Sequence, residues 1–158
     1  MNTTIQQLPV RGGELTVGTW GSASAEHAVL LIHGVTASHR AWDEFAPLLA
    51  AAGFYVVAPD LRGRGRSATL PGPYGMQQHA EDMANVLQAL DVSNVTVIGH
   101  SMGGFVGITF AHRYSHQVTK LVLVDGGLPL SVPVGLDADE VIQLILGPTA
   151  ERLAKTFG

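Results

Sequence analysis

The chain has 158 residues, of which 46% are hydrophobic and 14% are charged, so it is long and apolar enough to fold as one domain. Its formal net charge is −4 without any basic run, and this argues against nucleic-acid binding. It has no cysteine, which excludes disulfides and cysteine-based metal sites, and no apolar run approaches the roughly 18 residues of a membrane span. The first 16 residues lack the apolar centre of a signal peptide. We therefore expect a cytoplasmic protein with neither a nucleic-acid nor a membrane partner.

Strands and helices alternate along the chain after residue 28. Apolar segments predict strands over 5–9, 14–20, 28–33, 54–58, 95–98 and 118–124, the first two joined by a turn at 11–13. Helical spacing of apolar residues predicts helices over 41–52, 76–90 and 102–114. Pro47 lies inside the first of these helices and is expected either to kink it or to delay its start. The alternation favours a mostly parallel sheet with flanking helices.

Residues 95–104 carry the strongest chemical signal. An apolar strand runs into Gly99, turns at Ser101 and leaves as a helix, so the segment fits a nucleophile elbow, G-x-S-x-G. Gly99 and Gly103 carry no Cβ, which lets neighbouring backbones approach closely at little cost. Ser101 is therefore a candidate nucleophile. On the motif alone, a glycine-rich turn with an incidental serine is the alternative.

Two backbone N–H groups are candidates for an oxyanion hole. The N–H of Met102 stands at the start of a helix, where unpaired donors favour an anion. At the end of strand 28–33, Gly34 follows His33 and lets the backbone pass close to a ligand, so the Val35 N–H could be the second donor. A tight loop between strand and helix is the alternative. We interpret His33 as a structural residue that bonds nearby loop backbone rather than as a proton shuttle.

Two aspartates also follow predicted strands. Asp60 opens the segment D-L-R-G-R-G-R-S, residues 60–67, whose three arginines could suggest anion binding. We favour the interpretation that Asp60 and Arg62 brace this loop, because three arginines do not make a basic patch. Asp125 follows the last strand and could orient a catalytic histidine. It could as easily accept hydrogen bonds from the backbone of its own turn.

Together these residues resemble the α/β-hydrolase fold superfamily over about residues 5–130. The hairpin, the His33-Gly34 loop, the 60–67 loop and the GHSMGG elbow occur in the order of that family. The resemblance implies a hydrolase with Ser101 as nucleophile and a small molecule as substrate, and this chemistry requires no metal or organic cofactor. The family's dehalogenases and epoxide hydrolases carry an aspartate at the elbow, so Ser101 argues against both. Esterases, lactonases, carbon–carbon bond hydrolases and cofactor-free perhydrolases remain.

The resemblance also implies a division of the chain. Residues 1–130 correspond to the N-terminal part of the hydrolase core, which is truncated after the sixth strand. Residues 131–158, with short helices predicted over 136–146 and 148–157, look like the beginning of the family's helical cap or lid.

One part of the family pattern is missing. The family places a serine first, then an acid, then a histidine, yet no histidine follows Asp125. The His100 side chain should leave the elbow in another direction than the Ser101 hydroxyl. The remaining histidines are interpreted as loop or helix-surface residues: His27, His39, His79, His112 and His116. We therefore expect this chain alone to be inactive, as the N-terminal part of a hydrolase. It could be a shortened chain, an incomplete gene or one piece of a split protein.

Two functions stay open at this point. The first is a carboxylesterase-like enzyme that cleaves an ester, thioester, lactone or carbon–carbon bond through an acyl-enzyme. The second is a non-enzymatic member of the same fold that binds a small molecule or a protein, which the missing histidine favours. Strand 118–124 is expected to end the sheet, and its unpaired outer edge would invite self-association.

Overall fold

A computed structural model describes residues 3–127; the predicted cap, 131–158, and its two helices lie outside the described residues. The described part is an α/β fold built on a six-stranded sheet, as the sequence predicts. Its strands are β1 (Thr4–Val10), β2 (Gly13–Trp20), β3 (His27–Ile32), β4 (Phe54–Pro59), β5 (Val95–His100) and β6 (Val118–Val124). Its helices are α1 (Ala46–Ala51), α2 (Met76–Ala89) and α3 (Met102–Arg113), with 3-10 turns η1 (His39–Trp42), η2 (Gly65–Ser67) and η3 (Ser115–Gln117).

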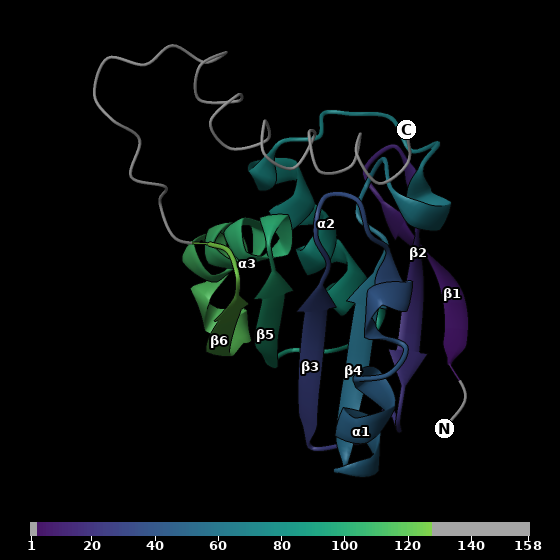
Figure 1. Ribbon diagram of the computed structural model, residues 1–158, viewed down its shortest axis with the longest axis vertical. Helices are drawn as coiled ribbons and strands as arrows, with labels where there is room; N and C mark the ends of the chain where they lie inside the picture. Colours follow the sequence, from purple (N-terminus) through teal and green to yellow (C-terminus); the bar gives the residue numbers. More distant parts are fainter. Residues whose placement is uncertain (1–2, 128–158) are drawn as a thin grey trace, which may run out of the picture. The chain divides into compact units, whose positions relative to one another are not determined.

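The strands lie in the order β1-β2-β4-β3-β5-β6 across the sheet (Figure 1). The pairs β1–β2 and β2–β4 are antiparallel, whereas β4, β3, β5 and β6 run parallel to one another. The predicted hairpin and the mostly parallel sheet are therefore confirmed. Because β3 and β5 are neighbours, with Ile32 opposite Gly99, their carboxyl ends reach the same edge of the sheet. The segments 33–36 and 99–103 both begin at that edge.

The central strand β3 is buried on both faces of the sheet. Leu30 and Ile32 pack into a cluster that also holds side chains of α2 and α3. Val29 and Leu31 pack into a second cluster, on the opposite face, with side chains of α1. Successive residues of a strand point to opposite faces, so a strand covered on both sides reads as an unbroken apolar run.

The predicted helix over 41–52 is shorter than expected. The structure has the 3-10 turn η1 first, and the regular helix α1 starts only at Ala46, with Pro47 in its first turn. Proline has no N–H to donate and fits the first turn, where that donor would have no partner. Of the two effects expected of Pro47, the delayed start is the one found. None of the helices among residues 3–127 is long and apolar enough to cross a membrane.

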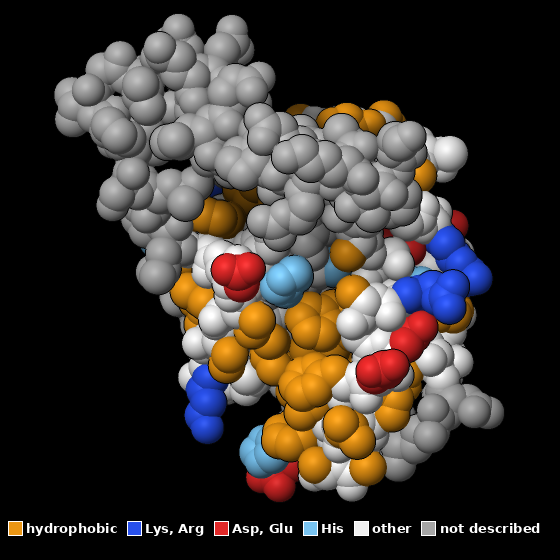
Figure 2. Space-filling model, in the orientation of Figure 1, with side chains coloured by type: hydrophobic (Ala, Val, Ile, Leu, Met, Phe, Trp, Pro, Cys, Tyr) orange, Lys and Arg blue, Asp and Glu red, His pale blue; other side chains and the backbone are white. Residues whose placement is uncertain are grey.

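The strand β6 leaves apolar side chains exposed at one edge of the sheet. Val122 and Val124 are 44% and 43% exposed. Val122 lies opposite Ile98, which packs against the cluster under α1, so the exposed valines lie on the face that carries α1. Figure 2 shows hydrophobic side chains gathered on this face of the molecule. Parallel sheets are ordinarily covered on both faces. On the face that carries α1, the described helices cover only part of the sheet.

Candidate active site

Ser101 sits on a strained turn between β5 and α3. Its backbone angles are φ 52° and ψ −120°, a conformation that non-glycine residues rarely adopt. The turn is held from both sides: the Ser101 N–H donates to the Val124 carbonyl at 3.0 Å, and the Ser101 carbonyl accepts from the Gly104 N–H at 2.9 Å. Such strain costs about 1–3 kcal/mol and persists only where the surrounding structure imposes it. The geometry is that of the nucleophile elbow expected from the sequence.

The two glycines that flank Ser101 are required by close backbone contacts. A Cβ on Gly99 would lie 2.8 Å from the Gly104 Cα and closer still to the Gly103 backbone. A Cβ on Gly103 would lie 2.7 Å from the His33 carbonyl oxygen and against the end of β3. These contacts are too short for any side chain, so the turn presses α3 against the end of β3.

The loop after β3 lies directly beside Ser101. A Cβ placed on Gly34 would stand 3.3 Å from the Ser101 Cβ and 3.4 Å from the His100 Nδ1. Val35 follows Gly34 in this loop, and Met102 is the first residue of α3, where an N–H has no acceptor within the helix. The structure therefore brings together the two segments that carry the expected oxyanion donors. That both N–H groups meet at one oxygen position stays a prediction.

His33 is a fully buried residue that fixes residues 33–36, the candidate oxyanion loop. Its Nε2 accepts from the Leu61 N–H at 3.0 Å, so the ring proton is on Nδ1, which donates to the Gly34 carbonyl at 2.7 Å. Burial lowers the pKa of His33 and keeps the ring neutral. The carbonyl that accepts this bond belongs to the same peptide unit as the Val35 N–H. A bond to that carbonyl polarises the unit and strengthens its N–H as a donor.

Asp60 braces the loop that follows β4. Its buried carboxylate accepts from the His39 N–H at 2.6 Å, from His39 Nδ1 at 2.7 Å and from the Arg66 N–H at 2.7 Å. Burial by itself raises the pKa of Asp60, but these three hydrogen bonds outweigh it and the net pKa is lowered. The bracing role expected from the sequence is found. His39, interpreted as a loop or helix-surface residue, is instead buried as the partner of Asp60.

Arg62 is the second brace of that loop. Its guanidinium donates to both carboxylate oxygens of Asp82 on α2, at 2.9 and 2.8 Å, and also to the carbonyls of Pro71 and Arg11. Asp82 was not identified from the sequence, and the interpretation of His79 as a helix-surface residue is wrong. Both side chains are fully buried. Positions 79, 82, 83 and 86 share one helical face with the apolar stripe, and that spacing is the signal that could have found them.

Arg64 lies against the oxyanion loop and was not singled out from the sequence. Its Nε donates to the Val35 carbonyl at 2.8 Å, and its Nη1 donates to the Arg62 carbonyl at 3.2 Å. A cavity of about 450 Å³ opens beside it, lined by Val35, Gly63, Arg64, Ala68 and Tyr74.

The Ser101 hydroxyl has no histidine as a partner in the structure. All seven histidines lie within residues 3–127, and none of their ring nitrogens is hydrogen-bonded to Ser101. Asp125 follows β6 with φ 48° and is exposed. Its expected role as the acid of a triad stays a prediction.

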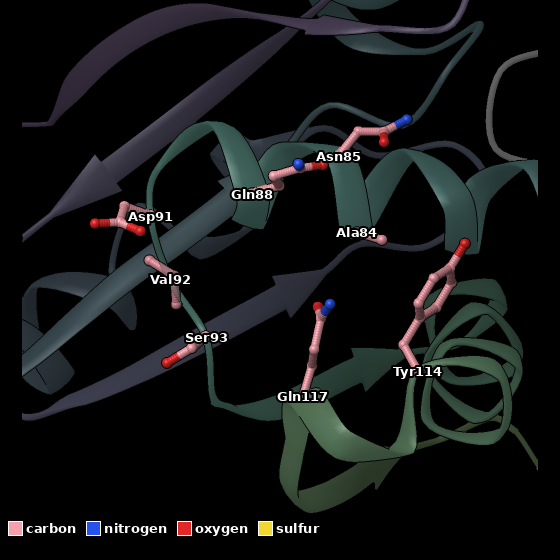
Figure 3. A pocket seen from close by; sticks show the side chains of 8 residues that line it. All are labelled: Ala84, Asn85, Gln88, Asp91, Val92, Ser93, Tyr114 and Gln117. Atoms are coloured by element: carbon pink, nitrogen blue, oxygen red, sulfur yellow. The ribbon is translucent and has the colours of Figure 1, made fainter.

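A further cavity, of about 460 Å³, lies well away from Ser101. Figure 3 shows Tyr114 and Gln117, which follow α3, pointing toward residues in the last turns of α2, among them Ala84 and Gln88. This cavity lies near the start of β5, at the amino ends of the parallel strands, whereas Ser101 lies at their carboxyl ends. Ligands of open α/β sheets bind at the carboxyl ends, so this cavity is not part of the candidate active site.

Comparison with known proteins gives a consistent result. The family model described as the alpha/beta hydrolase fold matches residues 27–153. An uncharacterised protein of Mycobacterium tuberculosis is 34% identical over 142 residues, which are 84% of this chain and 41% of the relative. The human serine hydrolase-like protein is 35% identical, over 88% of this chain and 66% of its own length. A 2-hydroxy-6-oxo-2,4-heptadienoate hydrolase of Pseudomonas putida is 30% identical, over 87% of this chain and 51% of its own.

Solved structures of hydrolases also resemble this chain in fold. The epoxide hydrolase CorEH superposes with a TM-score of 0.77 at 28% identity, over 93% of this chain and 50% of that one. The thioesterase domain from the curacin biosynthetic pathway superposes with a TM-score of 0.76 at 28% identity, over 99% of this chain and 63% of that one. The chain thus spans about two fifths to two thirds of the length of the proteins that it matches.

Proposed function

Because the chain belongs to the α/β-hydrolase fold family, we propose that Ser101 is the nucleophile of a hydrolase that cleaves an ester, thioester, lactone or carbon–carbon bond through an acyl-enzyme. The observation that carries the proposal is the strained Ser101 turn, packed against the Gly34 loop at the end of the sheet. A serine at the elbow, where epoxide hydrolases of the family have an aspartate, favours acyl transfer over epoxide opening. The thioesterase and serine hydrolase-like names of similar proteins agree with this choice.

In the proposed reaction, the Ser101 oxygen attacks the substrate carbonyl carbon and the carbonyl oxygen becomes an oxyanion. The N–H groups of Val35 and Met102 donate to that oxygen, as an oxyanion hole does. His33 holds the Gly34–Val35 peptide in place through its hydrogen bond to the Gly34 carbonyl. It takes no proton from Ser101, since its Nε2 already accepts from the Leu61 N–H. Collapse of this intermediate expels the leaving group, which takes up the proton lost by Ser101, and an acyl-serine remains. Water then attacks the acyl carbon, which releases the acid and returns a proton to Ser101.

A base must still remove the proton of the Ser101 hydroxyl. None of the seven histidines is bonded to that hydroxyl, so we propose that the base is supplied from outside this chain, with either Asp125 or an acid from outside the chain as its partner. Loss of one triad member typically costs several orders of magnitude in rate. The chain on its own is therefore expected to acylate slowly and to turn over poorly.

The second candidate function is a non-enzymatic binding protein of the same fold. It is favoured by the lack of a histidine bonded to the Ser101 hydroxyl, since all seven histidines lie in the part of the chain that the structure describes. In that case the strained turn would serve ligand binding alone, and no acyl-enzyme would form.

Covalent labelling distinguishes the two candidates. We expect an alkyl fluorophosphonate to modify Ser101 in a protein that contains this chain together with the proposed base, as located by peptide mass spectrometry, and the Ser101→Ala variant to stay unlabelled. Ser93 provides a matched control, because it is an exposed serine on the loop before β5. The Ser93→Ala variant should be labelled like the parent. If another residue is labelled and the Ser101→Ala variant is labelled equally, Ser101 is not the nucleophile. If Ser101 does not react, the binding protein is favoured.

A further inference from the structure

Arg64 carries a positive charge that no described acid neutralises. Arg62, two residues earlier, is paired with Asp82 at 2.8 Å. Among residues 3–127, no carboxylate lies within ion-pair distance of Arg64. Its bonds to the carbonyls of Val35 and Arg62 fix the guanidinium in place without cancelling its charge. A cation held by neutral acceptors remains available to an anion.

The position of this charge is set by the oxyanion loop. The Arg64 Nε is 2.8 Å from the Val35 carbonyl oxygen. The backbone of one residue spans at most ~3.6 Å, so the far end of the guanidinium lies within about 9 Å of the Val35 N–H. A substrate whose carbonyl oxygen meets that N–H would have Arg64 within reach of a group a few bonds away.

The cavity beside Arg64 presents apolar side chains within a lining of mixed polarity. Val35 and Tyr74 are half exposed, at 50% and 51%, and Ala68 lines the cavity with them. The Tyr74 ring is seated against Gly63, where a Cβ would lie 2.8 Å from the ring and where φ is +79°. Glycine at position 63 therefore lets the ring form a wall next to Arg64. The cavity thus places a few apolar contacts next to one cation.

We propose that Arg64 binds a carboxylate of the substrate, so that the substrate class is an ester or thioester that carries a second, anionic carboxyl group. The carbon chain of the substrate lies along Tyr74, Ala68 and Val35, and its carboxylate accepts from the terminal nitrogens of Arg64. Arginine favours this role because its guanidinium keeps its charge and presents several N–H donors in one plane. The proposal rests on Ser101 as the nucleophile, yet carboxylate binding can be measured without any reaction.

The experiment compares a charged and an uncharged ligand on the Ser101→Ala variant, which cannot form an acyl-enzyme. Monomethyl adipate carries the carboxylate, dimethyl adipate does not, and NMR titration gives a Kd for each. We expect the monoanion to bind about tenfold more tightly, the preference of a charge-assisted hydrogen bond. Arg64→Gln should bring the ratio of the two Kd values close to one, and Arg64→Lys should restore part of it.

Arg66 provides the matched control. It lies in the 3-10 turn η2, which Arg64 directly precedes, and its exposed side chain lines no part of the cavity. Arg66→Gln removes the same charge as Arg64→Gln. We expect this variant to keep the parent ratio. Equal binding of the two esters by the parent, or an equal loss in the Arg64 and Arg66 variants, would overturn the proposal. Arg64-dependent binding, with no fluorophosphonate labelling of Ser101 even in a protein that also contains the proposed base, would uphold the carboxylate site and refute the hydrolase.

Discussion

The buried ion pair between Arg62 and Asp82 should be one of the costliest places to mutate in this protein. Arg62 is 1% exposed and Asp82 is fully buried. The Arg62 guanidinium is 2.6 Å from the Pro71 carbonyl and 2.7 Å from the Arg11 carbonyl, and Asp82 also accepts from Gln78 at 3.1 Å. The hydrogen bond to Asp82 raises the pKa of Arg62, so the arginine stays charged throughout the accessible range. The pair ties α2 to the hairpin turn and to the loop after β4.

Removal of one partner leaves the other charge buried without compensation. Asp82→Leu should lower the free energy of unfolding by about 3–5 kcal/mol, the usual cost of an unpaired buried charge. Arg62→Met should cost a similar amount, because it leaves Asp82 and two carbonyls without their donor. The double variant removes both charges, so it should cost about 2 kcal/mol less than the sum of the single variants. A large coupling is the signature of a pair that acts as one unit.

Urea unfolding followed by circular dichroism measures these effects, provided that the m-value stays unchanged. The exposed pair Arg40–Asp43, at 3.3 Å, is the matched control, and Asp43→Leu should cost less than about 1 kcal/mol. The interpretation fails if Asp82→Leu costs as little as Asp43→Leu. It also fails if the costs of Asp82→Leu and Arg62→Met simply add.

Three other predictions follow from features already described. Ser101→Gly should raise the melting temperature, because relief of the positive φ recovers about 1 kcal/mol, and a lower melting temperature would contradict the strain. Burial lowers the pKa of His79 to about 4, so the unfolded chain binds a proton that the folded chain refuses between about pH 6.5 and pH 4. The free energy of unfolding should therefore decrease as the pH is lowered through that window, by at most about 1.4 kcal/mol per pH unit. In urea titrations at several pH values, His79→Phe should flatten this dependence and His116→Gln should leave it unchanged. We expect the chain to sediment as a self-associated species and lysine at both Val122 and Val124 to shift it toward the monomer, and a parent chain that sediments as a monomer would contradict this.

The sequence predicted the sheet and the elbow because both depend on local patterns. An apolar run such as 28–33 is long enough to form a buried strand and too short for a typical helix. The elbow needs glycine at 99 and 103 for steric reasons that hold wherever the turn occurs. His33 could also be assigned correctly, since a histidine at the end of a buried strand has mostly backbone groups around it.

The remaining features depend on contacts between distant segments. His39 meets Asp60, and Arg62 meets Asp82, only because the strand order brings their loops and α2 together. Neither the order of the strands nor these partners are encoded in the spacing of apolar residues. Arg64 illustrates the same limit: nothing near it in sequence shows that its nitrogen would reach the carbonyl of Val35.

The central place of β3 has a consequence for the order in which the protein folds. This strand pairs with β4 on one side and with β5 on the other, so its second pairing must wait until β4, α2 and β5 have all been synthesised. Such non-local pairing closes a long loop and slows folding. The turn at Ser101 is clamped between the end of β3 and the backbone at Gly126, which follows β6. The nucleophile can therefore reach its strained conformation only after both neighbouring strands are in place, which makes the reactive turn one of the last parts of the fold to form.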